Sequence, residues 1–324
     1  MERSDAHRLE FTEAELHAAR AFNAKLARMP RFRIRNRFTP LLYQSLLRLS
    51  QVGVDRRTRR RGVTVERRRV GWNGQEVAVR ILRPRGPVRG VVLDVHGGGW
   101  AIGNAAMDDD LNLGLIAACG VTVVSVDYRL VGARSTLQAA MDDCFAAAAW
   151  LLRGEHDLRG LPVVLVGESA GGHLGAATLL RVKAELGGLE RFAGALLYYG
   201  VYDLAGTPSV RAAGRDTLVL DGRGMLGAMR LLTPDMDDAA RRQAPLSPLF
   251  GDLAGMPPAL MAVGELDPLL DDTVAMAERW GATAAVELHR VPEAPHGFIR
   301  FPTPLAEKML ARSRAWVRER LAAY

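Results

Sequence analysis

The stretch Gly167-Glu168-Ser169-Ala170-Gly171 carries more information about fold and chemistry than any other part of this chain. It has the form G-x-S-x-G, follows an apolar run at 162–166 and precedes a run of small residues at 172–180. This order predicts a strand, a sharp turn and a helix. Such a turn holds its serine in a strained conformation with the hydroxyl exposed, and glycines on both sides avoid a clash. A serine hydroxyl alone is a weak nucleophile, so we expect a base, an orienting acid and oxyanion donors elsewhere.

Two later loops supply a candidate acid and a candidate base. Asp267 follows the apolar run 259–263, and His296 follows the alternating run 285–291, so each is placed directly after a predicted strand. We therefore predict that Ser169 is the nucleophile, that His296 is its general base and that Asp267 orients the imidazole. The chain order Ser, Asp, His is the order typical of α/β-hydrolases.

A run of glycines follows the strand-like run 91–95, where residues 96–100 read HGGGW. Three consecutive glycines after a buried strand are costly unless the backbone must come close to another group. We predict that the backbone N–H groups of Gly97, Gly98 and Ala170 form an oxyanion hole. A G-x-S-x-G turn can also join a strand to a helix without any chemistry. The glycine loop and the ordered acid and base favour an active site.

Hydrophobic patterns alternate between strand-like and helical along most of the chain. The strand-like runs are 63–65, 77–82, 91–95, 121–126, 163–166, 193–199, 259–263 and 286–291, and the helical ones are about 108–118, 137–153, 169–186, 271–281 and 304–322. The central runs are continuously apolar and β-branched, as buried parallel strands are. The fold class predicted is α/β: an α/β-hydrolase fold with an eight-stranded, mostly parallel sheet, helices on both faces and a helical cap.

Two segments lie outside this alternation. Residues 1–55 form a predicted N-terminal helical cap segment, and residues 56–324 form the catalytic domain. Within that domain, residues 203 to about 247 are longer than a simple crossover, so we interpret them as a second cap element. The alternatives are an N-terminal helix packed on the outside of the fold and, for the methionine-rich stripe in the insertion, ordinary core packing.

The motifs together resemble the hormone-sensitive-lipase-like esterases of the α/β-hydrolase superfamily. The matching stretches, within residues 60–324, are 96–100, 127–130, 167–172, 247–249, 267–269 and 295–298. The resemblance implies a cap over the active site and hydrolysis of short- to medium-chain carboxylic esters without a metal or an organic cofactor. It also implies a homodimer that forms through the edge of the last strand, at 285–291.

The substrate pocket is defined less sharply than the catalytic residues. We predict substrate contacts from Trp100, which follows the glycine loop, and from Phe38, Tyr43 and Met225 in the two cap segments. Core packing is the alternative for Trp100 and Met225. Structural roles are assigned to six polar residues: Glu168 bonded to neighbouring backbone, His96 bracing the glycine loop, Asp127 as an acceptor at a strand end, His173 as a helix residue without catalytic role, and Asp271 and Asp272 as helix N-caps.

Composition limits the other classes of function. The 324 residues are 48% hydrophobic and carry a formal net charge of +7, much of it from arginines at 56–61 and 67–69. No aromatic platform is interleaved with these arginines, so we favour a solvated surface over an anionic partner and predict no nucleic-acid partner. No stretch of about 18 apolar residues occurs and residues 1–16 lack a signal-peptide pattern, so we expect no stable membrane insertion and a cytoplasmic location. Cys119 and Cys144 are predicted to be buried thiols.

The leading hypothesis is a serine carboxylesterase that acts on a small-molecule ester. An amidase, a carbamate hydrolase or a lactonase would use the same triad, because the leaving group is recognised elsewhere in the pocket. A remote alternative is a non-catalytic small-molecule-binding module on the same fold. The presence of all three predicted triad residues disfavours that alternative.

Overall fold

One eight-stranded sheet organises the computed structural model, which describes residues 9–33 and 39–324. The strands lie in the order β1-β2-β4-β3-β5-β6-β7-β8. Their bounds are β1 Thr64–Trp72, β2 Gln75–Arg83, β3 Gly90–Val95, β4 Val121–Asp127, β5 Val163–Glu168, β6 Phe192–Tyr198, β7 Ala259–Gly264 and β8 Val286–Val291. β1 and β2 pair antiparallel with each other and β2 pairs antiparallel with β4, whereas every later pair is parallel. The predicted α/β-hydrolase sheet is therefore confirmed.

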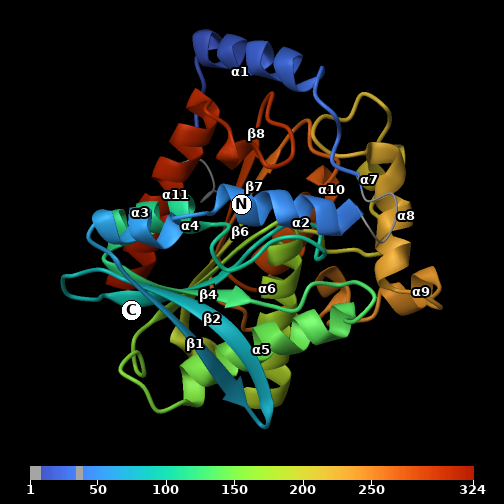
Figure 1. Ribbon diagram of the computed structural model, residues 1–324. Helices are drawn as coiled ribbons and strands as arrows, with labels where there is room; N and C mark the ends of the chain where they lie inside the picture. Colours follow the sequence, from blue (N-terminus) through green and yellow to red (C-terminus); the bar gives the residue numbers. More distant parts are fainter. Residues whose placement is uncertain (1–8, 34–38) are drawn as a thin grey trace.

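Helices cover both faces of this sheet (Figure 1). Their bounds are α1 Glu13–Leu26, α2 Thr39–Ser50, α3 Val54–Arg60, α4 Asp109–Cys119, α5 Leu137–Arg153, α6 Ala170–Arg181, α7 Pro208–Ala212, α8 Gly222–Leu232, α9 Asp238–Arg241, α10 Leu270–Gly281 and α11 Pro304–Ala322. Alternate side chains of β3 enter opposite cores, because successive residues of a strand point to opposite faces. Val91 and Leu93 join the core under α5, α6 and α10, whereas Val92 joins the core under α4 and α11.

The first strand is longer than predicted. The sequence pattern indicated only 63–65, but β1 extends over Thr64–Trp72. It is an edge strand that pairs only with β2, and most of its residues are exposed. Charged residues therefore replace the apolar alternation on which the prediction depended. Both cysteines are buried free thiols, as expected.

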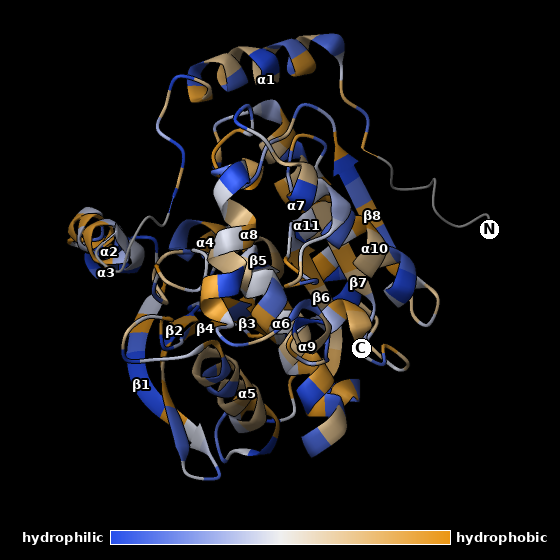
Figure 2. Ribbon diagram, turned by 90° about the vertical axis from the view of Figure 1, so that its right-hand side faces the viewer, coloured by the Kyte–Doolittle hydropathy of each residue, from blue (hydrophilic) through white to orange (hydrophobic). Residues whose placement is uncertain are grey.

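The N-terminal helices lie on two different sides of the molecule (Figures 1 and 2). α1 packs outside α11, where Phe22 contacts Phe301 with 5.2 Å between ring centroids and Lys308 pairs with Glu15 at 2.7 Å. α2 instead lies over the loop after β3, because Gln44 exchanges two hydrogen bonds with Gly103. The described residues contain no helix that combines the length and apolar character of a membrane span.

The insertion between β6 and β7 contains α7, α8 and α9. It meets the N-terminal segment where Phe32 forms an isolated parallel bridge with Leu220. Within α8, Met229 is buried in the core whereas Leu231 is exposed. Part of the predicted methionine stripe is thus core packing, and the helix also presents an outer surface.

Candidate active site

Ser169 lies in the sharp turn between β5 and α6. Its backbone has φ 54° and ψ −119°, a region that non-glycine residues rarely adopt. The turn is held because the Ser169 N–H donates to the Tyr198 carbonyl at 2.9 Å. A side chain at 171 would bring its Cβ within 1.9 Å of the Val95 carbonyl, so Gly171 is required for this approach of α6 to β3. The predicted strand, turn and helix are all present.

The loops after β7 and β8 bring Asp267 and His296 to the same edge of the sheet as Ser169. The Nδ1–H of His296 donates to Oδ2 of Asp267 at 2.8 Å, and the Ser169 hydroxyl donates to Nε2 of His296 at 3.0 Å. Both His296 and Asp267 are buried. The second carboxylate oxygen of Asp267 accepts the Leu269 N–H at 2.9 Å, and the ring of Tyr199 packs edge-on against His296 at 4.7 Å. These contacts leave the imidazole one orientation, with Nε2 toward the serine.

The glycine loop curls beside the serine turn. Gly98 has φ 100°, and a Cβ there would lie 2.0 Å from the Ile102 carbonyl, so the loop depends on glycine at this position. The N–H groups of Gly97, Gly98 and Ala170 have no hydrogen-bond acceptor among the described residues. Ala170 is also the first residue of α6, where the helix dipole favours negative charge. The three amides are therefore donors without a partner beside the Ser169 turn.

His96 braces this loop, as predicted from its position. Its Nδ1–H donates to the Gly97 carbonyl at 2.8 Å, and its ring stacks on Tyr128 with centroids 4.2 Å apart. The Tyr128 hydroxyl in turn donates to the His96 carbonyl at 2.9 Å. Burial lowers the pKa of His96 to about 4, so the ring is neutral near pH 7.

Of the four predicted substrate contacts, three lie among the described residues, and none of these three shares a hydrogen bond or an aromatic ring contact with Ser169, Asp267 or His296. Trp100 is buried, and its Nε1–H donates to Nδ1 of His173 at 3.1 Å. Tyr43 packs against Phe32 with centroids 5.3 Å apart, and Met225 packs half-buried on the main core. Phe38 lies outside the described residues.

His173 holds two segments together across the core. Its Nδ1 accepts from Trp100 and its Nε2–H donates to the Leu246 carbonyl at 2.8 Å. Burial lowers its pKa to about 4, so it serves as a neutral link between the glycine loop and the insertion.

Asp127 acts as an acceptor at the end of β4, as predicted, since its carboxylate accepts the Ala105 N–H at 3.2 Å.

Glu168 differs from its predicted role. Its carboxylate does not bond to neighbouring backbone but accepts from the Arg300 Nε–H at 2.9 and 3.0 Å and from the Tyr199 hydroxyl at 2.9 Å. Arg300 also pairs with Asp108. Burial opposes ionisation of Glu168, but the adjacent Arg300 lowers its pKa below the ordinary value. The signal missed in the sequence is that a glutamate ending an apolar strand needs a cation, and Arg300 lies four residues after His296.

The predicted N-caps Asp271 and Asp272 are a second error. α10 begins at Leu270, so both aspartates lie within its first turn and neither caps it. Asp272 is buried and accepts the backbone N–H groups of Tyr202 at 2.7 Å and Asp203 at 3.0 Å. Asp271 accepts the Ser209 N–H at 2.8 Å. Both carboxylates therefore anchor the start of the insertion between β6 and β7, which no local pattern indicates.

A groove of about 1000 Å³ runs along the free edge of β8, between that strand, the segment before α1 and α11. Its lining includes Phe11, Leu288, His289 and Trp316 but no triad residue. This is the strand edge at which the resemblance implies a homodimer.

Among the described residues, no cluster of three or more His, Cys, Asp or Glu side chains could hold a metal ion.

Comparison with known proteins agrees with this geometry. A family described as alpha/beta hydrolase fold matches residues 92–300. The carboxylesterase NlhH of Mycobacterium tuberculosis is 31% identical over 271 residues, which cover 80% of this chain and 83% of NlhH. The ethyl acetate hydrolase of Pseudomonas putida is 31% identical over 248 residues, covering 72% of this chain and 75% of the relative. The crystal structure of a bacterial hormone-sensitive lipase family esterase superposes with a TM-score of 0.73 at 26% identity, covering 96% of this chain and all of that one.

Proposed function

This chain belongs to the α/β-hydrolase family and to its hormone-sensitive-lipase-like esterases, and from this premise we propose that it is a serine carboxylesterase working through an acyl-enzyme on Ser169. The observation that carries the proposal is the hydrogen-bonded relay from Asp267 through His296 to Ser169, at 2.8 and 3.0 Å. The Ser169–His296 distance lies within the range over which a proton moves between nucleophile and base, and the Asp267 contact orients the imidazole for that transfer.

In the proposed mechanism, Ser169 attacks the ester carbonyl while Nε2 of His296 takes the hydroxyl proton. The resulting imidazolium is stabilised by Asp267, which stays ionised and keeps the ring oriented. His296 then passes the proton to the leaving alcohol. Water attacks the acyl-enzyme with the same histidine as base, which releases the acid and restores Ser169.

The N–H groups of Gly97, Gly98 and Ala170 are proposed to bind the oxyanion that forms at the carbonyl. Two observations support this role: the three amides have no acceptor among the described residues, and they flank the serine turn. Donors already in position lose little free energy to reorganisation when the charge develops. A single donor of this kind contributes about 3 to 4 kcal/mol to transition-state stabilisation.

The N-terminal segment 1–55 and the insertion at about 203–247 are proposed to act together as the cap. Their junction supports this, because Phe32 exchanges backbone hydrogen bonds with Val219 at 2.6 Å and Asp221 at 3.0 Å. Short- to medium-chain esters are the proposed substrates, in line with the name of the ethyl acetate hydrolase relative. Within this cap, Tyr43 and Met225 remain the described candidates for substrate contact, along with Trp100 beneath it.

The test is hydrolysis of p-nitrophenyl esters from acetyl to palmitoyl by the wild type and by Ser169→Ala. We expect the rate to peak at short or medium chains and to fall on the order of 10⁴-fold or more in the variant. A wild-type rate that Ser169→Ala leaves unchanged contradicts the mechanism. If no ester is hydrolysed but an amide, a carbamate or a lactone is cleaved in a Ser169-dependent way, the substrate class is that one and not a carboxylic ester.

A further inference from the structure

The outer face of α2 carries a row of leucines exposed to solvent. Leu41, Leu42, Leu46 and Leu49 have exposed fractions of 62, 62, 55 and 70%, and Val52 just after the helix is 69% exposed. These five are nearly half of the large hydrophobic side chains that are exposed in the described chain, yet they lie within twelve residues. A concentration of this kind marks an interaction site more often than chance exposure does.

The opposite face of α2 is what fixes the helix to the molecule. The Gln44 amide accepts the Gly103 N–H at 2.9 Å and donates to the Gly103 carbonyl at 2.8 Å. Gln51 exchanges a similar pair with Asn104, at 3.1 and 2.7 Å. Residues 42, 46 and 49 follow the i, i+4, i+7 spacing of one helix face. With the glutamines turned inward, these leucines point outward.

The basic helix α3 follows α2 on the same side of the molecule. In Figure 1 the two helices succeed one another across the front, and in Figure 2, turned by 90°, they overlap at one edge. Around the leucines the chain exposes six arginines: Arg48, Arg56, Arg57, Arg59, Arg60 and Arg61. Of these, Arg61 pairs with the exposed Asp110 at 3.3 Å, and Arg48 interacts electrostatically with Asp127.

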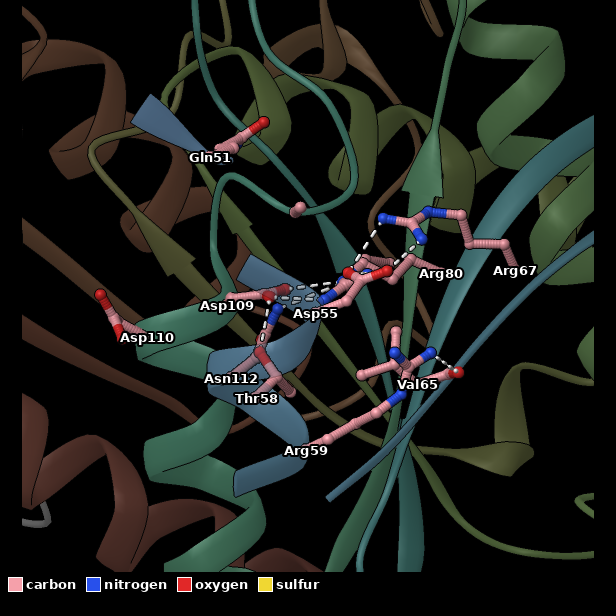
Figure 3. Close-up of polar contacts among 12 residues, drawn as sticks. Gln51, Asp55, Thr58, Arg59, Val65, Arg67, Arg80, Asp109, Asp110 and Asn112 are labelled. Atoms are coloured by element: carbon pink, nitrogen blue, oxygen red, sulfur yellow. Dashed lines mark hydrogen bonds and ion pairs between the residues drawn. The ribbon is translucent and has the colours of Figure 1, made fainter. Parts of the chain in front are cut away.

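The acidic side chain of α3, Asp55, points toward Arg80 and Arg67 (Figure 3). Asp55 pairs with the buried Arg80 at 2.6 Å and with Arg67 of β1 at 3.0 Å. Arg80 also makes two contacts with Asp109, at 2.9 and 2.7 Å, and Thr58 donates to the same carboxylate at 3.2 Å. Because α3 uses its acid to bind the core, its arginines remain on the outer surface with little compensating charge.

We propose that α2 and α3 form a docking surface for an anionic lipid bilayer, the leucines entering the boundary between headgroups and acyl chains and the arginines contacting lipid phosphates. Apolar side chains flanked by arginines are the features of helices that lie in this interface. The arginines alone favoured a solvated surface. The leucines beside them are the observation that changes this interpretation.

Charge argues against the other occupants of this face. A second copy of the chain would bring two sets of these arginines together around the same leucines, which is unfavourable. A nucleic acid would pair with the arginines but would leave the leucines in water. An anionic bilayer satisfies both groups at once. Docking would also place the glycine loop near the lipid, because Gly103 and Asn104 are bonded to α2.

The experiment is cosedimentation of the full chain with vesicles of phosphatidylcholine alone and of phosphatidylcholine with phosphatidylglycerol. We expect binding only to the anionic vesicles, weakened by salt because charges at a surface are screened. Leu42→Ser/Leu46→Ser/Leu49→Ser should lower the partition coefficient at least about tenfold, since the inserted apolar area is lost. Arg56→Ser/Arg60→Ser should lower it by a similar factor. The matched control is Leu231→Ser/Met236→Ser, which removes two exposed hydrophobic side chains from the insertion and should bind as the wild type does.

Several results would overturn the proposal. They are absence of binding to anionic vesicles, equal binding to both vesicle types, or a leucine variant that binds like the wild type. Sedimentation velocity without lipid tests whether a second copy of the chain occupies this face. If the wild type is a dimer and the leucine variant is a monomer, the face serves self-association instead. Ser169→Ala should bind vesicles as the wild type does, and the leucine variant should hydrolyse p-nitrophenyl acetate normally. Failure of the esterase mechanism and failure of docking are thereby distinguishable.

Discussion

Two buried ion clusters meet at the first residues of α4, and they differ in charge balance. Asp108 belongs to the cluster under the serine turn, where Arg300 also holds Glu168 and lies near Asp94. Asp109 belongs to the cluster under α3, where Arg80 joins it to Asp55 (Figure 3). The first cluster has three carboxyl groups for one arginine, whereas in the second Arg67 adds a further cation.

This difference in charge balance shifts the pKa values of the carboxyl groups in the two clusters. In the cluster under the serine turn, burial raises the pKa of Asp94 to about 6 and that of Asp108 well above its ordinary value. In the cluster under α3, burial of Asp55 is outweighed by Arg67 and Arg80, which lower its pKa. Asp94 and Asp108 in the first cluster therefore have raised pKa values, whereas Asp55 in the second cluster has a lowered one. The first cluster lies directly under the Ser169 turn, whereas the second attaches α3 to the sheet.

The largest expected effect tests the link between the first cluster and catalysis. Arg300→Met leaves Glu168 and Asp108 buried without their cation, which should lower the free energy of unfolding by about 3 to 5 kcal/mol. Glu168 precedes Ser169 and Arg300 follows the His296 loop, so the positions of both Ser169 and His296 should shift. We expect kcat on p-nitrophenyl acetate to fall on the order of 10²-fold per folded molecule. Urea unfolding and steady-state kinetics measure the two effects.

Arg300→Lys serves as the companion variant, because it keeps the charge but not the forked contact. It should recover part of the stability and less of the activity. An Arg300→Met protein with wild-type kcat would show that the first cluster is only structural, and the contrast between the clusters would be lost.

Arg80→Met is the matched change in the second cluster. It leaves Asp55 and Asp109 without their shared cation, so we expect a similar loss of about 3 to 5 kcal/mol in urea unfolding. The catalytic loops do not contact Arg80, so kcat per folded molecule should stay within about twofold of the wild type. A kcat reduced as far as in Arg300→Met would mean that the two clusters act as one unit.

The smallest expected effect concerns pH. The folded-state pKa of Asp94 is raised, so the stabilisation from its proton is complete below about pH 4 and is lost as pH rises through about 6. Asp94→Asn should remove this loss and gain up to roughly 3 kcal/mol relative to the wild type at pH 7. Asp55→Asn should behave in the opposite way, because its pKa is lowered: the variant is less stable at pH 7, and the deficit shrinks as pH falls. The Asp55 effect changes only below about pH 4, whereas the Asp94 effect changes between about pH 4 and 7, so unfolding curves between about pH 2 and 7 measure both. Two variants with the same sign would contradict the contrast.

The sequence predicted the juxtaposition of Ser169, Asp267 and His296 better than it predicted these clusters. Ser169, Asp267 and His296 each follow an apolar run, and parallel strands bring their carboxyl ends to one edge, so local patterns sufficed to bring the three together. The partners of Arg300 are 132 and 192 residues distant, and no local pattern marks them. The N-cap error at Asp272 has the same cause, since its acceptor role is decided by backbone at 202 and 203.

The remaining differences between prediction and structure lie at the edge of the sheet and on the surface of the molecule. β1 was predicted too short because an exposed strand with one neighbour needs no apolar alternation. The outward leucines of α2 were read only as part of a helical cap, because a sequence does not state which face of a helix stays uncovered. The strand positions in the centre of the sheet, by contrast, are buried on both faces and were predicted to within one or two residues.

The adjacency of Asp108 and Asp109 restricts how the length of the preceding loop can vary. Successive residues at the start of a helix point about 100° apart, so each carboxylate meets its own arginine only in the present register. An insertion or deletion of one residue between the glycine loop and α4 would have to be absorbed within 101–107, where Gln44 and Asp127 hold the Gly103 and Ala105 N–H groups. Substitutions of the half-buried Ala106 and Met107 should therefore be tolerated better than changes in length. Loop grafting between related chains should succeed only between loops of equal length.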